Sequence, residues 1–286
     1  MKTLREQLQN AAFDAGGSFK TREGRQIVVA RFHDFLKTQN IQIRSIEQIK
    51  GKYIQAYVQF RKANGIGIRT LQNEVTALRC TLRAVGRNKL AEQLDNKALG
   101  ISGASRDGTK TAMSDARFAT LRTAVFALDH GVCACIDLER ALGLRAEEAV
   151  KSCKSLISWA KQLASGKPVH VIFGTKGGRP RLVHPANRQR AIDAVQAAQE
   201  LAACQNGVLI NKPDEKSAMN RYKNVMTSAG FKGKESGHAL RYAFARDQIE
   251  AYLALGYSKA ESLALTSTDL GHGDGRGRYI AQVYVR

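Results

Sequence analysis

The sequence predicts a mainly α-helical protein of two domains with one small β-hairpin. Apolar residues recur at helical spacing through most of the chain, with a clear stripe across residues 69–85. One β-prone run, residues 169–173, is followed by a second at residues 181–184. Between residues 99 and 113, glycine, serine and charged residues interrupt any periodicity. A chain of 286 residues also exceeds the roughly 150 residues that are usual for one domain.

Residues 1–98 are predicted to form a compact helical bundle. Gly16 and Gly17 end the first helix, and Gly65 ends the third. The polar faces of these helices are rich in Lys and Arg, which by itself is usual for a solvated helix face. The predicted helices span residues 4–15, 20–39, 46–64 and 69–85.

Residues 99–113 are predicted to be a flexible linker, and residues 114–286 a second domain of mixed α/β structure. Ser114 and Ser236 are suitable helix N-caps, and Gly143 breaks the helix before it. The predicted helices of this domain pass through residues 114–128, 136–143, a segment that begins at 145, then 187–204, 216–228, 236–255 and 258–269.

The hairpin is predicted from the pairing of residues 169–173 with residues 181–184. Its tip reads G-T-K-G-G-R-P and carries Lys176 and Arg179, two long cations that can extend away from the fold. A single exposed lysine in a turn is common and alone indicates little. The phosphate-binding pattern G-x-x-x-x-G-K-[ST] is absent from this tip.

The chain is strongly basic. Lys and Arg number 45 against 25 Asp and Glu, which gives a formal net charge of +20. A protein this basic usually binds a polyanion; nucleic acid is the leading candidate and an anionic membrane surface the competitor. The sequence has no apolar run of about 18 residues and no signal-peptide pattern, so we expect a cytoplasmic, nucleoid-associated protein. Two basic domains on a flexible tether can close around a DNA duplex from both sides.

The cysteine pattern argues against a disulfide framework or a zinc site. The five cysteines are odd in number and scattered, and Cys133 and Cys135 form a C-x-C pair with no second cluster. We therefore expect reduced, mostly buried thiols in a cytosolic protein.

The stretch from residue 238 to residue 284 gathers side chains that suit attack on a phosphodiester. His238 and Arg241 are three residues apart near a helix start, so they share a face, and the helix start itself favours an anion. His272 follows in a glycine-rich turn, and Tyr279 and Tyr284 come after it. Arginine can bind two phosphate oxygens, histidine can move protons near neutral pH, and a tyrosine hydroxyl can form a covalent bond to phosphorus. A lone histidine near a helix start is more often part of the core, but the paired arginine weakens that alternative.

Arg145 and Glu148 form a second candidate pair. They are three residues apart at the start of a predicted helix, so the carboxylate can orient the guanidinium. Taken alone, the pair would be interpreted as an exposed ion pair worth a few tenths of a kcal/mol, on the order of other surface pairs.

In this order and spacing, the motifs resemble the tyrosine recombinase (phage integrase) family. The matching segments are G-L-R-A-E-E with Arg145, G-T-K-G-G-R with Lys176, H-A-L-R-Y with His238 and Arg241, L-G-H with His272, and a terminal tyrosine. The resemblance implies a helical N-terminal core-binding domain and a mixed α/β catalytic domain. Within the first, R-T-L-Q-N at 69–73 resembles the helix that meets DNA, which implies DNA contacts by Arg69, Thr70 and Asn73, with Arg179 added from the hairpin.

The resemblance implies metal-independent cleavage and rejoining of DNA without a cofactor. Arg145, His238, Arg241 and His272 would bind the scissile phosphate and stabilise its added negative charge. Lys176 would protonate the leaving 5′ oxygen, and tyrosine would form a 3′-phosphotyrosyl link. Glu148 would orient Arg145. The implied partners are double-stranded attachment sites, held by a homotetramer on two duplexes, with accessory DNA-bending proteins possible.

The sequence departs from the family at the nucleophile. The family usually places its tyrosine about nine residues after the L-G-H histidine, where this chain has Ala281. Tyr279 is seven residues after His272 and Tyr284 is twelve after it. Val283-Tyr284 matches the apolar-tyrosine pair of the family, and the G-D-G-R-G-R turn looks like a local insertion. We therefore expect Tyr284 to be the nucleophile, with Tyr279 as the alternative.

The purpose of the reaction stays open. Integration or excision of a mobile element is the leading interpretation. The alternatives are Xer-like dimer resolution or inversion, relaxation of supercoils as in a type IB topoisomerase, and a catalytically inactive architectural DNA-binding protein. Family members commonly carry a further segment after the tyrosine that docks on a neighbouring subunit. The sequence ends at Arg286, two residues after Tyr284, so that segment is missing by nature or by truncation, and assembly in the tetramer stays open.

Overall fold

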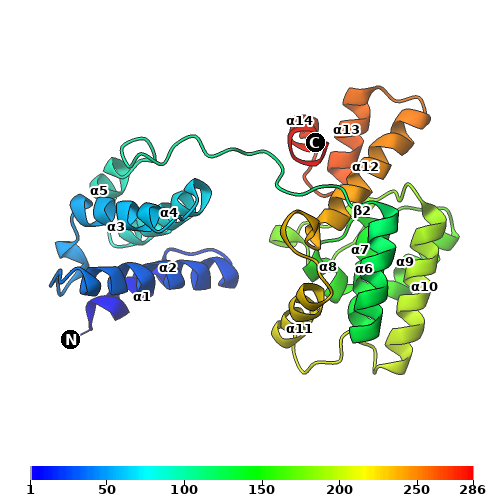
Figure 1. Cartoon of the computed structure of the whole chain (residues 1–286), viewed down its shortest axis with the longest axis horizontal. Helices are drawn as coiled ribbons and strands as arrows, with labels where there is room; N and C mark the ends of the chain where they lie inside the picture. Colours follow the sequence, from blue (N-terminus) through cyan, green and yellow to red (C-terminus); the bar gives the residue numbers. More distant parts are fainter. Residues whose placement is uncertain (1, 286) are drawn as a thin grey trace. The chain divides into compact units, whose positions relative to one another are not determined.

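The computed structural model describes residues 2–285 and divides into two compact units, one up to Ser105 and one from Arg106 onward. Helices dominate both units, and the described residues contain one two-stranded sheet (Figure 1). Each unit has its own cluster of buried apolar side chains. The predicted class, mainly α with a small hairpin, is confirmed.

The first unit is a helical bundle. Thr3 and Glu6 form a capping box that begins its first helix, and Ser18 caps the second through the backbone N–H of Thr21. A short helix, α5, follows the four that the sequence predicts. The elements are α1 (Leu4–Asp14), α2 (Phe19–Thr38), the 3₁₀ turn η1 (Ile46–Gln48), α3 (Gly51–Ala63), α4 (Ile68–Ala84) and α5 (Asn88–Gln93).

A buried carboxylate lies inside this bundle. Glu74 of α4 is 3% exposed and accepts hydrogen bonds from three side chains. Arg31 donates at 2.6 Å, Arg61 at 2.7 and 3.1 Å, and the Tyr57 hydroxyl at 2.9 Å. These contacts join α2, α3 and α4 around one negative charge.

The ends of the predicted linker pack into the units. Leu99 and Ile101 are buried in the core of the first unit, and Met113 is buried in the core of the second. The backbone N–H of Gly108 donates to the carbonyl of Gln282, and that of Thr111 donates to Lys234. Residues at both ends of the predicted linker, 99–113, therefore belong to the packed units: the first few pack on the first unit and the last few on the second.

The second unit contains the remaining helices and the hairpin. The elements are α6 (Asp115–Leu128), α7 (His130–Leu142), α8 (Ala146–Val150), η2 (Ser152–Lys154), α9 (Leu156–Ala164), β1 (Val169–Val171), η3 (Lys176–Gly178), β2 (Arg181–Val183), α10 (Arg188–Cys204), α11 (Glu215–Ser228), η4 (Gly233–Glu235), α12 (His238–Ala254), α13 (Lys259–Asp269) and α14 (Gly277–Tyr284).

Helix α7 lies at the centre of this unit. Nearly all of its residues are buried, and α6, α8, α10 and α12 pack against it (Figure 1). Helix α12 also packs on α13, which in turn contacts α14 and β2. Helix α12 therefore connects α13, α14 and β2 to the central helix α7.

The predicted hairpin forms, with shorter strands than expected. Val169 pairs with Val183 and Val171 with Arg181 in antiparallel register. Two helices of the second unit, α9 and α14, were not predicted. In α9, the buried Trp159 packs into the core and donates its indole N–H to the carbonyl of His170 at 2.9 Å. The last segment forms α14, whose buried face includes Ile280.

Five thiols are free, of which Cys133 and Cys135 are buried while Cys204 is exposed. The expectation of mostly buried thiols is therefore wrong for Cys204. Among the helices of residues 2–285, none has the length and apolar character that crossing a membrane would require.

Candidate active site

Arg241 lies at the centre of the candidate site. It is on α12, and only 1% of it is exposed. Its two terminal nitrogens donate to the backbone carbonyls of Gly143 and Leu270. Its Nε donates to the hydroxyl of Tyr284 at 3.4 Å. The guanidinium is thus held by oxygen atoms that carry no formal charge.

Gly143 explains how a carbonyl reaches Arg241. It ends α7 in the left-handed conformation, with φ of 59°. A Cβ on this residue would lie 2.4 Å from the ring of Phe244, so only glycine fits beneath α12. The close approach aims the carbonyl at the buried guanidinium.

Tyr284 places its hydroxyl between two candidate residues. Its ring is 3% exposed, and the hydroxyl lies 3.1 Å from Nε2 of His272 and within hydrogen-bond distance of Arg241. The ring of His238 is 6.3 Å from that of Tyr284, centroid to centroid. The ring of Tyr279 lies 4.8 Å from His272 and is 36% exposed. The helical form of α14 is what allows a residue twelve positions after His272 to return to it.

Both histidines have lowered pKa values. Burial, together with the charges of Arg241 and Arg145, lowers the pKa of His272 to about 3. The same causes lower the pKa of His238 by less, to about 4. Neutral imidazoles can accept as well as donate a proton. Burial lowers the pKa of Arg241 to about 10, which leaves it charged at neutral pH.

Arg145 and Glu148 lie together as the sequence predicts, and a third residue joins them. Glu148 accepts from the backbone N–H of Arg145 at 2.8 Å and from its guanidinium at 2.7 Å. Arg181 of β2 donates to both carboxylate oxygens, at 2.6 and 2.7 Å. Arg145 also approaches the carbonyl of Leu270 at 3.5 Å, the same carbonyl that Arg241 uses.

Glu148 is ionised in this setting. Burial by itself would raise the pKa of its carboxyl, but hydrogen bonds and charge from Arg181, with the charge of Arg241 and the backbone N–H of Arg145, lower it to about 2. Sequence reasoning missed Arg181. The only signal for it was its place in a β-prone run just after the hairpin tip.

The remaining candidates lie on exposed surfaces. Lys176 is in η3 at the hairpin tip, and Arg179 follows it; both are exposed. Within residues 2–285, no hydrogen bond or ion pair links Lys176 to the residues around Tyr284. In the first unit, Arg69, Thr70 and Asn73 are exposed on α4; the Arg69 guanidinium donates to the carbonyls of residues 104 and 105.

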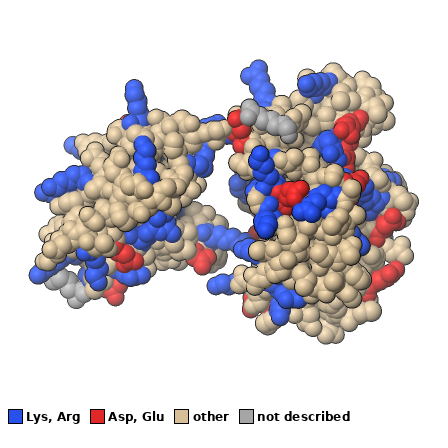
Figure 2. All heavy atoms as spheres, viewed as in Figure 1, with Lys and Arg blue, Asp and Glu red and all other residues tan. Residues whose placement is uncertain are grey.

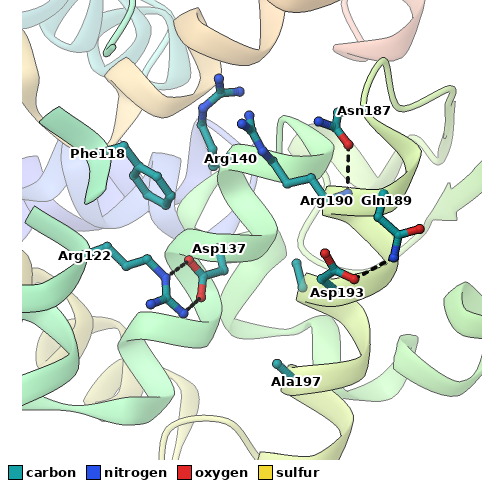
Figure 3. A pocket seen from close by; sticks show the side chains of 10 residues that line it. Phe118, Arg122, Asp137, Arg140, Asn187, Gln189, Arg190, Asp193 and Ala197 are labelled. Carbon is teal, nitrogen blue, oxygen red and sulfur yellow. Dashed lines mark hydrogen bonds and ion pairs between the residues drawn. The ribbon is translucent and has the colours of Figure 1, made fainter. Parts of the chain in front are cut away.

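Basic side chains outnumber acidic ones on the visible face of each unit (Figure 2). A separate cavity of about 540 Å³ lies between α6, α7 and α10 (Figure 3). Its arginines all pair with carboxylates: Arg122 with Asp137, and Arg140 and Arg190 with Asp115.

In the described part of the chain, no group of three or more His, Cys, Asp or Glu side chains is arranged to hold a metal ion.

The fold is similar to that of solved integrases. A lambda integrase fragment (75–356), crystallised as a dimer on a COC′ core site, superposes with a TM-score of 0.62 at 15% identity, covering 97% of this chain and 95% of that one. A lambda integrase tetramer bound to a Holliday junction gives 0.58 at 15% identity, covering 96% and 78%. The integrase of transposon Tn1549, bound to transposon right-end DNA, gives 0.59 at 12% identity, covering 99% and 95%.

The fold and this grouping of arginines, histidines and tyrosine define the class of tyrosine recombinases. An integrase family profile matches residues 100–247, and a profile for the N-terminal part of phage integrases matches residues 1–91. The chain belongs to the phage integrase family. A comparison with curated protein sequences gave no match.

Proposed function

We propose that this chain is a site-specific DNA recombinase that cuts and rejoins strands through a 3′-phosphotyrosyl intermediate and integrates or excises a mobile element. One observation carries the proposal: the Tyr284 hydroxyl is within hydrogen-bond distance of both Arg241 and His272. A nucleophile, a buried cation and a neutral proton acceptor meet at one point, as phosphoryl transfer requires.

In the proposed cleavage step, the oxygen of Tyr284 attacks phosphorus as the bond from phosphorus to the 5′ oxygen breaks. Arg145 and Arg241 donate to the non-bridging oxygens and stabilise the charge that develops on them. Nε2 of His272 accepts the tyrosine proton once the bound phosphate offsets the charges of Arg241 and Arg145, which otherwise help to keep the pKa of His272 low. Lys176 gives a proton to the departing 5′ oxygen. The number of phosphate ester bonds is unchanged, so a 5′ hydroxyl can reverse the reaction without ATP.

His238 lies beside the same phosphate position in this proposal. Its ring faces Tyr284 and Tyr242, and the first turn of α12 that carries it favours an anion. It would donate to a non-bridging oxygen. Glu148 orients Arg145, and Tyr279 packs on His272 without taking part in bond making.

The proposed partner is duplex DNA bearing attachment sites. The net charge of +20 supports it, as do the DNA complexes of lambda and Tn1549 integrases with the same fold. We assign DNA contacts to Arg69, Thr70, Asn73 and Arg179. A homotetramer on two duplexes follows the lambda integrase assembly on a Holliday junction, and Tyr284 acts in the pocket of its own subunit.

Covalent trapping tests the proposal. A binding site is first selected from a randomised duplex pool, and nicked suicide versions of the selected site are then incubated with wild type, Tyr279→Phe and Tyr284→Phe in the presence of EDTA. We expect a covalent protein–DNA adduct with wild type and Tyr279→Phe and none with Tyr284→Phe.

The other outcomes are equally informative. Loss of the adduct only with Tyr279→Phe would move the nucleophile. A wild-type chain that binds the site but never forms an adduct would make it an architectural DNA-binding protein. Supplying two intact sites then separates joining of two DNA molecules from resolution, inversion or simple relaxation.

A further inference from the structure

We propose that Arg181 is a positioning residue for Lys176: it clamps the hairpin that carries the lysine against the turn that carries Arg145. The inference rests on the proposed function, because it assigns Arg181 a part in delivery of the proton to the 5′ oxygen. Four features of the hairpin and its surroundings support it.

The first feature is the pair of hydrogen bonds from Arg181 to the carboxylate of Glu148. The side chain of Arg181 is 4% exposed and that of Glu148 is fully buried. Two parallel hydrogen bonds of 2.6 and 2.7 Å join the guanidinium to the carboxylate. The planar fork fixes the orientation of both groups, which a lysine cannot do. Strand β2 is thereby tied to helix α8, directly beside Arg145.

The second feature lies at the neck of the hairpin, where Gly174 on one side and Arg181 on the other connect the tip to the rest of the domain. Gly174 has φ of 75°, and a Cβ on it would lie 2.7 Å from the carbonyl oxygen of Glu147 and 2.9 Å from Cα of Glu148. The backbone of the chain leaving β1 therefore packs directly on α8. Both sides of the neck thus meet helix α8, and both Gly174 and Arg181 meet Glu148.

The third feature is the C-terminal end of α13. Nε of Arg181 donates to the carbonyl of Asp269 at 2.8 Å. The buried carboxylate of Asp269 accepts from the backbone N–H of His184 at 3.1 Å and contacts its Nδ1 at 3.0 Å. Leu270, the next residue after Asp269, supplies the carbonyl that Arg241 uses. Arg181 thus ties the hairpin to α8, next to Arg145, and to the end of α13, next to the carbonyl that holds Arg241.

The fourth feature is the hairpin itself, which has little rigidity of its own. Each strand has three residues, and the sheet contains only this pair. An isolated two-stranded hairpin is marginally stable in water. Lys176 lies at its exposed tip, five residues before Arg181. The position of the ammonium group thus depends on how the neck is held, and a misplacement of about 1 Å can lower a rate by about 10²-fold.

The test compares two leaving groups. Suicide duplexes carry either the natural 5′ oxygen at the scissile phosphate or a sulfur in its place. A thiolate departs without a proton, because a thiol ionises at a pKa of about 8.5, far below that of an alcohol. Cleavage rates are measured for wild type, Lys176→Ala, Arg181→Met and Arg181→Lys. Arg122→Met is the matched control, because Arg122 also forms two hydrogen bonds to a single carboxylate, that of Asp137, both at 2.7 Å.

We expect Arg181→Met to cleave the oxygen substrate about 10²-fold more slowly than wild type and the sulfur substrate within a few-fold of it. Lys176→Ala should share this pattern, Arg181→Lys should not restore the oxygen rate, and the control should match wild type on both substrates. Circular dichroism checks folding. If Arg181→Met does not fold, Gly174→Ala loosens the neck from its other side. This variant should also cleave the oxygen substrate slowly and the sulfur substrate at close to the wild-type rate.

Two results would overturn the inference while leaving the proposed function intact. In one, Arg181→Met is equally slow on both substrates, which would mean that Arg181 acts through Arg145 or the fold. In the other, Arg181→Met cleaves the oxygen substrate at the wild-type rate. Failure of wild type to form an adduct with either substrate would instead overturn the proposed function, and this inference with it.

Discussion

Each unit of this protein buries one glutamate among arginines, and the two arrangements differ in what they leave available. Glu74 in the first unit and Glu148 in the second are both almost fully buried, and each accepts four hydrogen bonds. Around Glu74, Arg31 and Arg61 both pair with the carboxylate. Their charge serves to hold helices together.

In the second unit, one cation is kept apart from the carboxylate. Arg181 pairs fully with Glu148, and Arg145 shares it, but Arg241 donates to two backbone carbonyls and a tyrosine hydroxyl. Neutral acceptors hold a guanidinium in place without cancelling its charge. The comparison shows that a carboxylate neutralises the arginines around Glu74, whereas uncharged oxygens orient Arg241, as its proposed phosphate-binding role would need.

The largest effect should come from removing that cation. Arg241→Ala should lower the rate of adduct formation by about 10³-fold or more, because it removes a charged donor that acts on the transition state. Binding of the selected duplex should stay close to wild type in a gel-shift assay. If binding collapses together with cleavage, Arg241 is structural, and the contrast with Glu74 no longer holds.

Removing the structural carboxylate should affect stability. Glu74→Ala should lower the free energy of unfolding of the first unit by about 3 kcal/mol, because two arginines and the buried hydroxyl of Tyr57 lose their partner. Denaturant unfolding measures this loss. Glu148→Ala should slow trapping per folded molecule, while Glu74→Ala should not; equal slowing by both would remove the distinction between the clusters.

The pH dependence of stability tests whether His272, beside Arg241, is neutral in the folded protein. The folded pKa of His272, about 3, lies below its ordinary value of 6.5, so between these values the unfolded chain binds more protons. Stability from this residue is complete above 6.5 and falls as the pH drops. These two pKa values correspond to about 2 kcal/mol between pH 7 and pH 5, and solvent around the half-buried ring reduces this figure. His272→Gln should therefore lose about 1–2 kcal/mol less than wild type over this pH range. Parallel stability curves for both proteins would contradict the neutral imidazole.

A charge on the hairpin tip should have the smallest effect. Arg179→Ala should weaken binding by a similar factor on all duplex sequences and reduce the slope of log affinity against log salt by about one. Titrations at several salt concentrations measure the slope. An unchanged slope would mean that Arg179 contacts no DNA phosphate.

Much of the fold follows from the sequence because its signals are local. Helical apolar spacing and the N-cap Ser114 mark the helices, and the structure forms that cap. The cap predicted at Ser236 is wrong, because α12 begins after Gly237 without a side-chain capping bond. The motif order also placed Arg145, His238, Arg241 and His272 in one group. The structure brings His238, Arg241 and His272 around Tyr284, and Arg145 approaches the Leu270 carbonyl that Arg241 uses. Whether they have the assigned roles remains a prediction.

The missed features depend on contacts between distant segments. An arginine in a short β-prone run is interpreted as exposed, and the burial of Arg181 comes from a carboxylate 33 positions earlier in the chain. Helix α9 has no strong start signal, because its N-cap position Ser155 makes no side-chain capping bond, and packing of Trp159 decides it. The helix at Tyr284 is short and follows several glycines, so propensity gave no clear indication.

The hydrogen bonds of Tyr284 have a consequence for the idle protein. One donor of Arg241 already points at the tyrosine hydroxyl, and a phosphate oxygen that takes this donor must release that hydroxyl. In the proposed mechanism, arrival of a phosphate would therefore free the Tyr284 hydroxyl when its target is in place. Tyr284 is otherwise only 3% exposed, with its hydroxyl beside Arg241 and His272. A duplex that places no phosphate on Arg241 would then leave this hydroxyl bound and unable to attack.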